Sequence, residues 1–370
     1  MLTMAAALGI DRFIYTPILP IMAEAERLSA TEAGLIASAN FLGYLVGALV
    51  AAISRLSGSR RGWLVGMLAL SALSTGVTGL ASSLPSFLLV RFAGGAAGAV
   101  AIVIAISLVV DAVGATGRNS LIALHFGGVG VGIATSAAVL SGLVLGGAGW
   151  RSLWMAAGSI SVLLSALVAL LTATEPAGKQ ALVSRNYKLL PGFKSLLVAN
   201  ALASFGYVMT ATFLVAMVRH QPELRPLEAW IWIVFGLATA PSVAAWIWIA
   251  SRKGIPRALA LAYLVEATGV ALSVLWPTQQ GMLIAAVFVG ATFIANTALG
   301  MMLARALCSG DLRKPVALMT AAFGVGQIAG PAFAGALHDA LGSFLFPSLI
   351  AATGVLIGAA LVGRLDLTRP

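Results

Sequence analysis

The sequence predicts an all-α polytopic membrane protein, with twelve transmembrane helices in two pseudo-symmetric six-helix bundles. Three observations lead to this fold class: an apolar composition, regularly spaced apolar runs and an internal repeat. Of the 370 residues, 60% are hydrophobic and only 9% are charged, and the mean hydropathy is +1.01. Soluble domains carry about 25% charged residues, so an ordinary soluble domain is excluded. The single cysteine, Cys308, excludes an intramolecular disulfide.

About twelve apolar runs are long enough to cross a hydrocarbon core of roughly 30 Å. The longest polar connection, at 173–193, divides the runs six plus six. We therefore expect a six-helix bundle at 1–172, a cytoplasmic linker at 173–193 and a second six-helix bundle at 194–370. The predicted segments lie near residues 2–23, 32–54, 63–81, 85–110, 119–145, 149–172, 194–218, 228–250, 257–276, 280–304, 315–337 and 343–363.

The first segment contains a polar stretch, residues 9–20, that includes two charges and two prolines. A charge near the middle of a bilayer costs about 2.5–3.5 kcal/mol on insertion scales, so Asp11 and Arg12 should face a protein interior or a wet cavity. Pro17 and Pro20 have no N–H group, so the carbonyl four residues before each loses its helical partner. Such a break is tolerated at membrane depth only where it is buried or lines a cavity. Segment 1 is therefore predicted to line a polar cavity.

The positions of the basic residues predict the orientation of the chain. Sixteen of the 22 Lys and Arg residues fall in the loops and C-terminus on one side, four fall on the other side, and two lie within segments. By the positive-inside rule, the side with sixteen is cytoplasmic, so both termini are expected to be cytoplasmic in a multi-pass inner (plasma) membrane protein. The sixteen are Arg55, Arg60, Arg61, Arg118, Lys179, Arg185, Lys188, Lys194, Arg252, Lys253, Arg257, Arg305, Arg313, Lys314, Arg364 and Arg369. The net charge of +10 then reflects topology, and no nucleic-acid partner is expected.

The two halves of the chain repeat at one constant offset. Arg61 after segment 2 corresponds to Arg257 after segment 8, which is an offset of 257 − 61 = 196 residues. The same offset relates Gly58 to Gly254, Phe92 to Phe288, Gly94 to Gly290, Arg118 to Lys314, and residues 128–130 to residues 324–326. With six segments in each half, the repeats share one orientation, as in parallel-repeat transporters.

Several stretches resemble signatures of the major facilitator superfamily (MFS). Loop 54–63 resembles a degraded form of its cytoplasmic 2–3 loop signature, without the expected acid, and residues 91–98 resemble its segment-4 signature of an arginine and a glycine-rich run. Within the superfamily, residues 9–20 and 323–331 are similar to the YbfB/YjiJ-type permeases. The resemblance implies the MFS fold and transport by alternating access, with one substrate site near the midplane between two bundles.

Candidate substrate-binding residues centre on Arg12. On a helix it would share a face with Tyr15 and Thr16, and its guanidinium could bind an anionic group of a substrate. The alternative is an intramembrane charge pair that holds segment 1 in place. Further candidates are Asn200, Tyr207, Asn296 and Gln327, which could equally be hydrogen-bonding contacts between helices.

Candidate proton-coupling residues are Asp11, Arg91 and His125. Asp11 and His125 are titratable groups at membrane depth. Arg91 could instead snorkel to the outer interface, and His125 could be a packing residue. For Glu266 in segment 9, an interhelical hydrogen bond is favoured over transport, and close helix packing explains the glycine runs.

The function expected from these observations is secondary active transport of a small molecule, coupled to protons. A cavity with Arg12 and Arg91 and few matching acids favours an organic anion or zwitterion. The alternatives are a broad-specificity drug or metabolite efflux permease and a non-transporting membrane sensor. No catalytic pattern, nucleotide loop or metal-ligand spacing is present, so an enzyme is not expected and no cofactor is predicted. The chain is expected to act as a monomer in the lipid bilayer.

Overall fold

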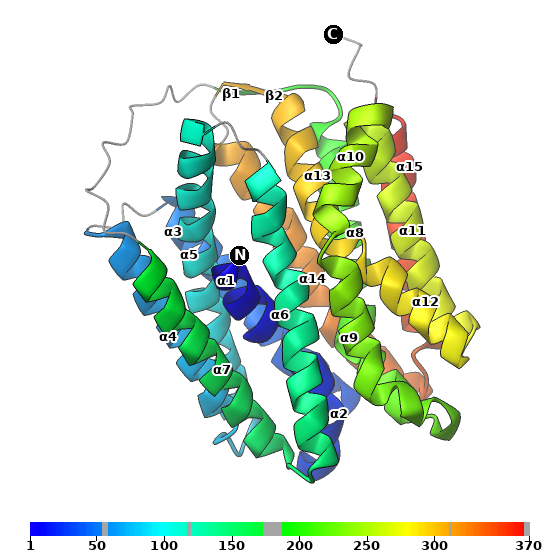
Figure 1. Ribbon diagram of the computed structural model, residues 1–370. Helices are drawn as coiled ribbons and strands as arrows, with labels where there is room; N and C mark the ends of the chain where they lie inside the picture. The colour runs from blue at the N-terminus through cyan, green and yellow to red at the C-terminus, as the bar shows by residue number, and fades with distance from the viewer. Residues whose placement is uncertain (54–57, 117–119, 173–186, 311–312, 366–370) are drawn as a thin grey trace.

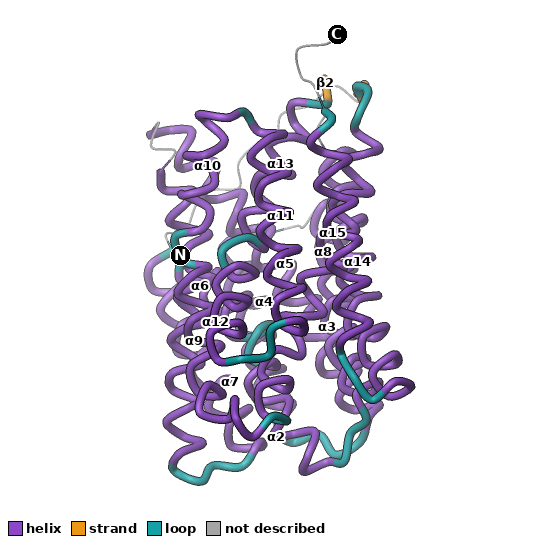
Figure 2. Tube along the Cα trace, turned by 90° about the vertical axis from the view of Figure 1, so that its right-hand side faces the viewer, coloured by secondary structure: helices purple, strands orange, loops and turns teal. Residues whose placement is uncertain are grey.

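The computed structural model describes residues 1–53, 58–116, 120–172, 187–310 and 313–365. Long helices run side by side along one axis, with short loops at both ends (Figures 1 and 2). The loops between α2 and α3 and between α6 and α7 lie at the lower end in Figure 1. This is the end that the charge distribution predicts to be outside, and it is called the predicted outer end below.

Segment 1 is built from three pieces: α1 (Leu2–Met4), the π-helix η1 (Ala5–Ile10) and α2 (Tyr15–Glu26). The other helices of the first half are α3 (Ala30–Ile53), α4 (Arg60–Thr78), α5 (Leu84–Thr116), α6 (Ser120–Leu145) and α7 (Trp150–Leu171). The second half contains α8 (Phe193–Arg219), the 3₁₀-helix η2 (Pro222–Leu227), α9 (Glu228–Thr239), α10 (Ser242–Lys253), α11 (Ile255–Leu275), α12 (Gln279–Gly290), α13 (Phe293–Ala306), α14 (Arg313–Leu341) and α15 (Leu345–Gly363).

The helices match the predicted segments, but not all of them are long and apolar enough to span a membrane as one piece. Among the described residues, ten spans are long and apolar enough, or eleven if the bent pair Pro222–Thr239 and Ser242–Lys253 is one span. The bend of 41° follows Pro241, which cannot donate a helical hydrogen bond. The predicted segment 63–81 is the 19-residue helix α4. Its arginine and hydroxyl side chains lower its hydropathy, and four of those hydroxyls are buried.

The surface away from both ends is apolar, as a lipid-facing surface requires. Leu73 on α4 and Leu163 on α7 are 56% and 70% exposed, which would be unfavourable in water and is suited to acyl chains. In segment 1, by contrast, 89% of the residues in an 18-residue stretch are buried inside the bundle. The other helices therefore surround the charged stretch, as predicted.

The halves contact each other mainly through α3 with α14, α6 with α9 and α2 with α8. Glycines permit the close approach. A Cβ atom added at Gly34 would lie 2.2 Å from the carbonyl oxygen of Pro331, and one added at Gly130 would lie 2.5 Å from that of Gly236. The close packing expected of the glycine runs is thus present at the interface between the halves.

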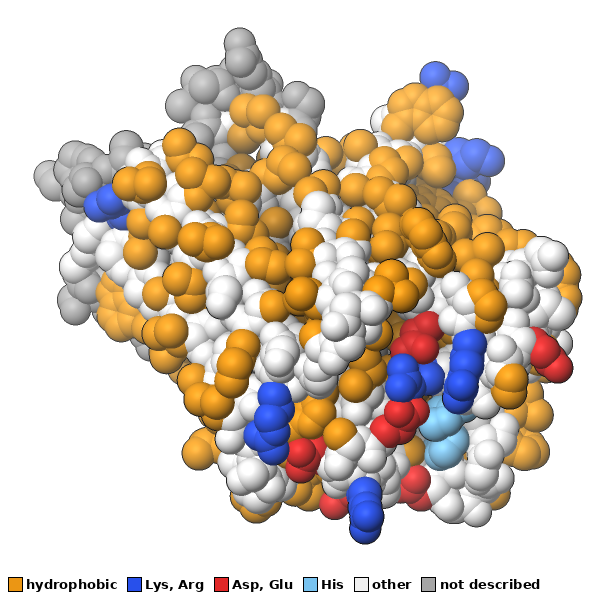
Figure 3. Space-filling view, turned by 60° about the horizontal axis from the view of Figure 1, so that its bottom comes forward, with side chains coloured by type: hydrophobic (Ala, Val, Ile, Leu, Met, Phe, Trp, Pro, Cys, Tyr) orange, Lys and Arg blue, Asp and Glu red, His pale blue; other side chains and the backbone are white. Residues whose placement is uncertain are grey.

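Charged side chains gather at the predicted outer end (Figure 3). The Arg219 guanidinium donates to both carboxylate oxygens of Glu24 from the other half, at 2.7 and 2.8 Å, and to Glu228 at 2.6 Å. The Asp339 carboxylate on α14 accepts the backbone N–H groups of Ala30 and Thr31, at 3.0 and 2.8 Å, and so caps the start of α3. These are called the outer-end contacts.

Part of the predicted linker forms a small sheet with the second half. Strand β1 (Tyr187–Leu189) pairs antiparallel with β2 (Cys308–Gly310). Residues 173–186 of the linker lie outside the described residues. The division into domains at 172 and 194 therefore stays a prediction.

Candidate functional site

The polar stretch of segment 1 contains an irregular turn, residues 11–14, between η1 and α2. The Asp11 N–H donates to Ala6 O at 2.8 Å and the Phe13 N–H donates to Leu8 O at 3.3 Å, which is the wide spacing of a π-helix. Such bulges are frequent at functional sites. The break therefore precedes Pro17, which is in the first turn of α2, where proline is tolerated. Pro20 lies inside α2, so the prolines restrict the position of the break without breaking α2 themselves.

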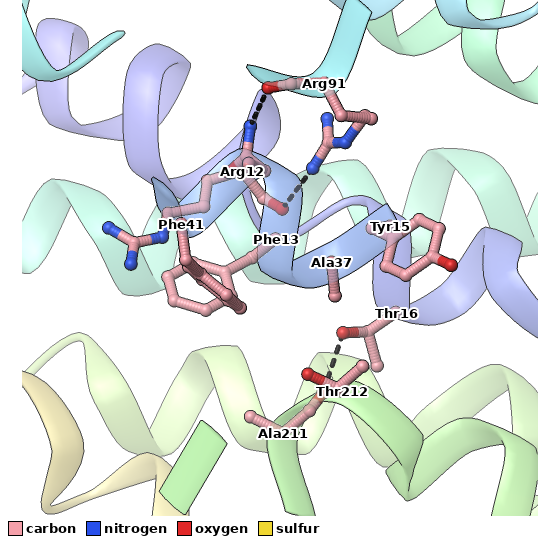
Figure 4. A pocket seen from close by; sticks show the side chains of 10 residues that line it. Arg12, Phe13, Tyr15, Thr16, Ala37, Phe41, Arg91, Ala211 and Thr212 are labelled. Atoms are coloured by element: carbon pink, nitrogen blue, oxygen red, sulfur yellow. Dashed lines mark hydrogen bonds between the residues drawn. The ribbon is translucent and has the colours of Figure 1, made fainter. Parts of the chain in front are cut away.

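Arg91 on α5 binds the backbone of this turn. Its guanidinium donates to the carbonyl oxygens of Asp11 and Arg12, at 2.9 and 3.2 Å, and the bond to Arg12 is drawn in Figure 4. It also lies over the rings of Trp154 and Tyr15, 5.1 and 5.7 Å from their centroids. Arg91 is 2% exposed, so the snorkelling alternative is wrong. Its charged donors satisfy carbonyls that the break has freed.

Arg12 points toward the second half of the chain. Its Nη2 donates to Gln327 Oε1 at 2.6 Å, and the Gln327 amide in turn donates to the hydroxyl of Tyr207. The guanidinium carbon lies 4.6 and 4.3 Å from the ring centroids of Phe41 and Tyr44. Its Nε has no hydrogen-bond partner, and no carboxylate of the described residues pairs with it. Among the described residues, the buried Arg12 cation therefore has dipoles and aromatic rings as neighbours and no carboxylate partner.

Asp11 points the opposite way, into the first half. Its Oδ1 accepts a hydrogen bond from Thr75 Oγ1 on α4 at 2.9 Å, and the hydroxyls of Ser71 and Ser161 lie beside it. Its Oδ2 is buried without a partner. No basic side chain in the described part of the chain lies within 4.0 Å of the carboxylate. Asp11 and Arg12 therefore do not form an ion pair with each other, nor Asp11 with Arg91.

Two small cavities adjoin the turn, each of about 10 Å³, which is room for roughly one water molecule. The first, shown in Figure 4, is lined by Arg12, Phe13, Tyr15, Thr16, Ala37, Asn40, Phe41, Arg91, Ala211 and Thr212. The second is lined by Ala7, Asp11, Arg12, Asn40, Tyr44, Ser71, Gly94, Gly95 and Gly98. Arg12 and Asn40 line both. A larger ligand would require the helices around them to separate.

Tyr15 and Thr16 line the first cavity with Arg12, but their polar atoms bind elsewhere. The Tyr15 hydroxyl donates to Ala33 O at 2.8 Å and the Thr16 hydroxyl donates to Ala211 O on α8 at 2.7 Å. The shared helical face expected from the sequence is lost because residues 11–14 form a turn. Thr16 links segment 1 to the second half instead.

The other predicted residues are divided between this site and the packing around it. Gln327 and Tyr207 belong to the Arg12 site. Asn200 donates to Met319 O at 3.0 Å, and Asn296 donates to the buried carboxylate of Glu266 at 2.7 Å, which is the interhelical bond expected for Glu266. His125 has the N-terminal amine as its polar neighbour, at 3.3 Å. The structure therefore does not bring these three to Arg12.

Several residues of the site were not predicted from the sequence. Ser71 and Thr75 on α4 and Ser161 on α7 surround the Asp11 carboxylate. Their spacing, four residues apart on α4, places two hydroxyls on one helical face, which is a signal in the sequence. Phe41 and Tyr44, which cover the Arg12 guanidinium, have a spacing of three that any apolar segment can show.

A broken, charged helix buried where two halves of a helical bundle meet is characteristic of secondary transporters. The chain belongs to the MFS family described as "Uncharacterised MFS-type transporter YbfB", whose profile matches residues 4–363. A point mutant of the nucleoside transporter NupG has a similar structure, with a TM-score of 0.78 at 14% identity over 99% of both chains.

A second similar structure is a bacterial homolog of the human lysosomal transporter Spinster, in an inward-facing and occupied conformation. The TM-score is 0.69 at 19% identity, over 98% of this chain and 94% of that one. At these identities the two likenesses establish the MFS fold and not a substrate. No curated protein sequence matches the chain.

Proposed function

We propose that this MFS protein is a secondary active transporter that moves a small organic anion or zwitterion by alternating access. The observation that carries the proposal is the Arg12 guanidinium, which is 7% exposed and pairs with no carboxylate of the described residues. Removing one charge from water costs several kcal/mol unless it is paired. A substrate anion would supply the missing charge, and the unpartnered Nε of Arg12 would be available to bind it.

The charges around the turn agree with an anionic substrate. Two guanidinium groups, Arg12 and Arg91, and one carboxylate, Asp11, border the two cavities. A bound anion would bring this net charge from +1 to zero. Within the same proposal, Asp11, Arg91 and His125 are the proton-coupling candidates, as proposed from the sequence, and Asp11 is the one that adjoins the Arg12 cavity.

The contacts between the halves support alternating access. Among the described residues, the hydrogen bonds that join the two halves through a side chain lie between the level of Arg12 and the predicted outer end. None of them lies between Arg12 and the opposite, predicted cytoplasmic end. They join Arg12 to Gln327, Thr16 to Ala211, Ser38 to Ile328, Ser141 to Ala229, Glu24 to Arg219, and Ala30 and Thr31 to Asp339. Breaking these bonds would open the site toward the outer end, which we propose is extracellular.

The proposal is tested with variants of Arg12 in purified, full-length protein. A thermal-shift screen of organic acids, zwitterions and apolar drugs, at two pH values, identifies ligands because binding stabilises the folded state. Radiolabelled uptake of the best ligand into proteoliposomes then follows for wild type, Arg12→Lys and Arg12→Ala. Lysine keeps the charge but loses the planar fork, so we expect transport to fall at least about tenfold in both variants.

The matched control is Arg151→Lys. Arg151 pairs with Glu26 at 3.1 Å at the predicted outer end, and its side chain is 45% exposed. Transport by the Arg151→Lys variant should therefore stay near the wild-type rate. Normal transport by Arg12→Lys would overturn the role of Arg12 as substrate anchor. Binding of many apolar cations and no anions would favour the broad-specificity efflux alternative.

A further inference from the structure

We propose that Glu266 and Asn296 form a proton-binding site in the second half of the chain, in which a protonated Glu266 carboxyl and the Asn296 amide bind each other through two hydrogen bonds. The inference deepens the proposed function, on which it rests, because it names a further residue for proton coupling. Glu266 lies in the middle of α11, and Asn296 lies in the first turn of α13. The site is separate from Asp11, whose carboxylate faces the first half.

The first argument is a pair of unused acceptor atoms. Asn296 Nδ2 donates to Glu266 Oε2 at 2.7 Å, but Glu266 Oε1 and Asn296 Oδ1 are both buried without a hydrogen-bond partner in the described structure. In an ionised pair neither atom can donate, because a carboxylate has only acceptors and Oδ1 is a carbonyl oxygen. A proton on Oε1 supplies the missing donor, so that the acid and the amide can satisfy each other. Unpaired buried polar atoms are rare in native proteins, which favours the protonated form.

The second argument is the lack of a neutralising charge. Glu266 is 0% exposed, and among the described residues no basic side chain lies within 4.0 Å of its carboxyl group. Asp11, by comparison, has the positive charge of Arg91 in its surroundings. An isolated charge buried in a protein is strongly unfavourable, and an ionisable group in that position becomes neutral instead. Of these two buried carboxyl groups, Glu266 is therefore the better placed to hold a proton.

The helices around Glu266 supply no charge at its level. α8, α10, α12, α13 and α15 pack against α11, and α12 and α15 contain no charged residue. The titratable groups that interact with Glu266 are two phenols, Tyr263 on its own helix and Tyr207 on α8. The other charged side chains of α8, α10, α11 and α13 lie in the first or last turns of these helices: Lys194, Arg219, Arg252, Lys253, Arg257 and Arg305. The protonation of Glu266 therefore depends on its burial and its hydrogen bonds, and not on an ion pair.

The third argument is the position of the site beside a break in segment 10. α12 ends at Gly290 and α13 begins at Phe293. The carbonyl oxygens of Gly290 and Ala291 accept hydrogen bonds from the Thr239 hydroxyl and the Trp246 indole, at 2.9 and 2.8 Å. Side chains of α9 and α10 thus satisfy the carbonyls at the break. The break lets α13 move relative to α12, and the proton site holds the first turn of α13 against α11.

The first turn of α13 also contacts the Arg12 site. The Phe293 ring centroid lies 5.3 Å from that of Phe13, the residue after Arg12, and 5.2 Å from that of Tyr207. Asn296 is three residues after Phe293, so the two are neighbours on the surface of α13. Loss of the proton would remove one of the two bonds to Asn296 and leave a buried carboxylate. The turn, and with it the substrate site, would therefore respond to release of the proton.

The test is infrared difference spectroscopy of the purified full-length protein in lipid nanodiscs. A protonated carboxyl group has a C=O stretching band that is separate from the bands of carboxylates and amides. We expect such a band in mildly acidic buffer, its loss as the pH is raised while the protein stays folded, and its absence from Glu266→Gln. Glutamine keeps the shape of the side chain but binds no proton. The matched control is Glu223→Gln, because Glu223 is exposed at the predicted outer end, and this variant should keep the wild-type band.

Asn296→Leu keeps the test valid if Glu266→Gln does not fold. This variant retains the acid and removes its hydrogen-bond partner. Because a hydrogen bond weakens the C=O bond that accepts it, the band should move to a higher wavenumber in Asn296→Leu. An unchanged band in this variant would overturn the assignment of Asn296 as the partner.

A wild-type spectrum without this band, or equal bands in wild type and Glu266→Gln, would overturn the inference. A band that persists to the highest pH at which the protein stays folded would make Glu266 a permanent hydrogen-bond donor and would also overturn it. Neither result would affect the proposed function, which fails separately if Arg12→Lys transports normally. Conversely, a Glu266 that titrates in a protein that moves no anion would uphold the proton site and refute the transport proposal.

Discussion

The contact of Arg91 with the broken backbone of segment 1 can be tested by removing its side chain. In Arg91→Ala, the carbonyls of Asp11 and Arg12 lose donors at 2.9 and 3.2 Å. A hydrogen bond to a charged group contributes about 1.5–3 kcal/mol, so two such bonds predict a loss of about 3–6 kcal/mol in the free energy of unfolding. Arg91 is 2% exposed, so the two carbonyls are not in contact with bulk water in the wild-type protein.

The assay is thermal unfolding of the detergent-purified protein, monitored by size-exclusion chromatography. Arg91→Lys retains the charge and can donate to one of the two carbonyls at a time, so its melting temperature should lie between wild type and Arg91→Ala. The control is Arg60→Ala, whose partner Asp111 is 60% exposed. Its expected loss is about 0–1 kcal/mol.

Equal melting temperatures for wild type and Arg91→Ala would refute the reasoning. That result would mean that the two carbonyls do not depend on Arg91. A loss in Arg91→Lys as large as that in Arg91→Ala would mean instead that the planar, two-pronged geometry of the guanidinium is required.

Two further predictions concern the contact between the halves. In Asp339→Ala, α3 loses its cap, which is worth about 0.5–2 kcal/mol. Labelling by a membrane-impermeant thiol reagent, at a cysteine that replaces Ala37 in a Cys308→Ser background, should then rise several-fold. Unchanged labelling would contradict a role for Asp339 in closing the outer end. In Gly130→Ala, the new Cβ would meet Ala240 N at 2.3 Å, and such overpacking costs about 1–3 kcal/mol. Gly142→Ala on the same helix meets nothing within 4 Å and should leave the melting temperature unchanged or higher; an equal drop in both would refute the packing argument.

Much of the fold could be predicted because bilayers restrict the choices. Apolar length indicated nearly every helix, whereas the bend in segment 8 next to Pro241 was not predicted. The burial of Arg12 and Asp11 also followed from the cost of charges in lipid, and both are less than 9% exposed. These are one-dimensional properties that a sequence displays directly.

The partners of those charges could not be predicted. Arg12 meets Gln327 across 315 residues of chain, and Arg91 binds backbone carbonyls, for which there is no complementary residue type to search. The break in the helix lies before Pro17 and not at the prolines, as the sequence had suggested. The π-helical spacing before Asp11 has no signature in a run of alanine, leucine and glycine. Two of the three hydroxyls around Asp11 were a recoverable signal, because Ser71 and Thr75 are four residues apart on α4 and so share a helical face.

The dependence of segment 1 on Arg91 has a consequence for the biogenesis of the protein. Segment 1 leaves the ribosome before α5 and α14, yet the donors for its freed carbonyls are on α5 and the amide that binds Arg12 is on α14. Until those helices are made, the segment exposes two charges and unpaired carbonyls, which lipid does not tolerate. We therefore expect segment 1 to reach its final position only when α5 and α14 dock against it, so that the order of assembly differs from the order of synthesis.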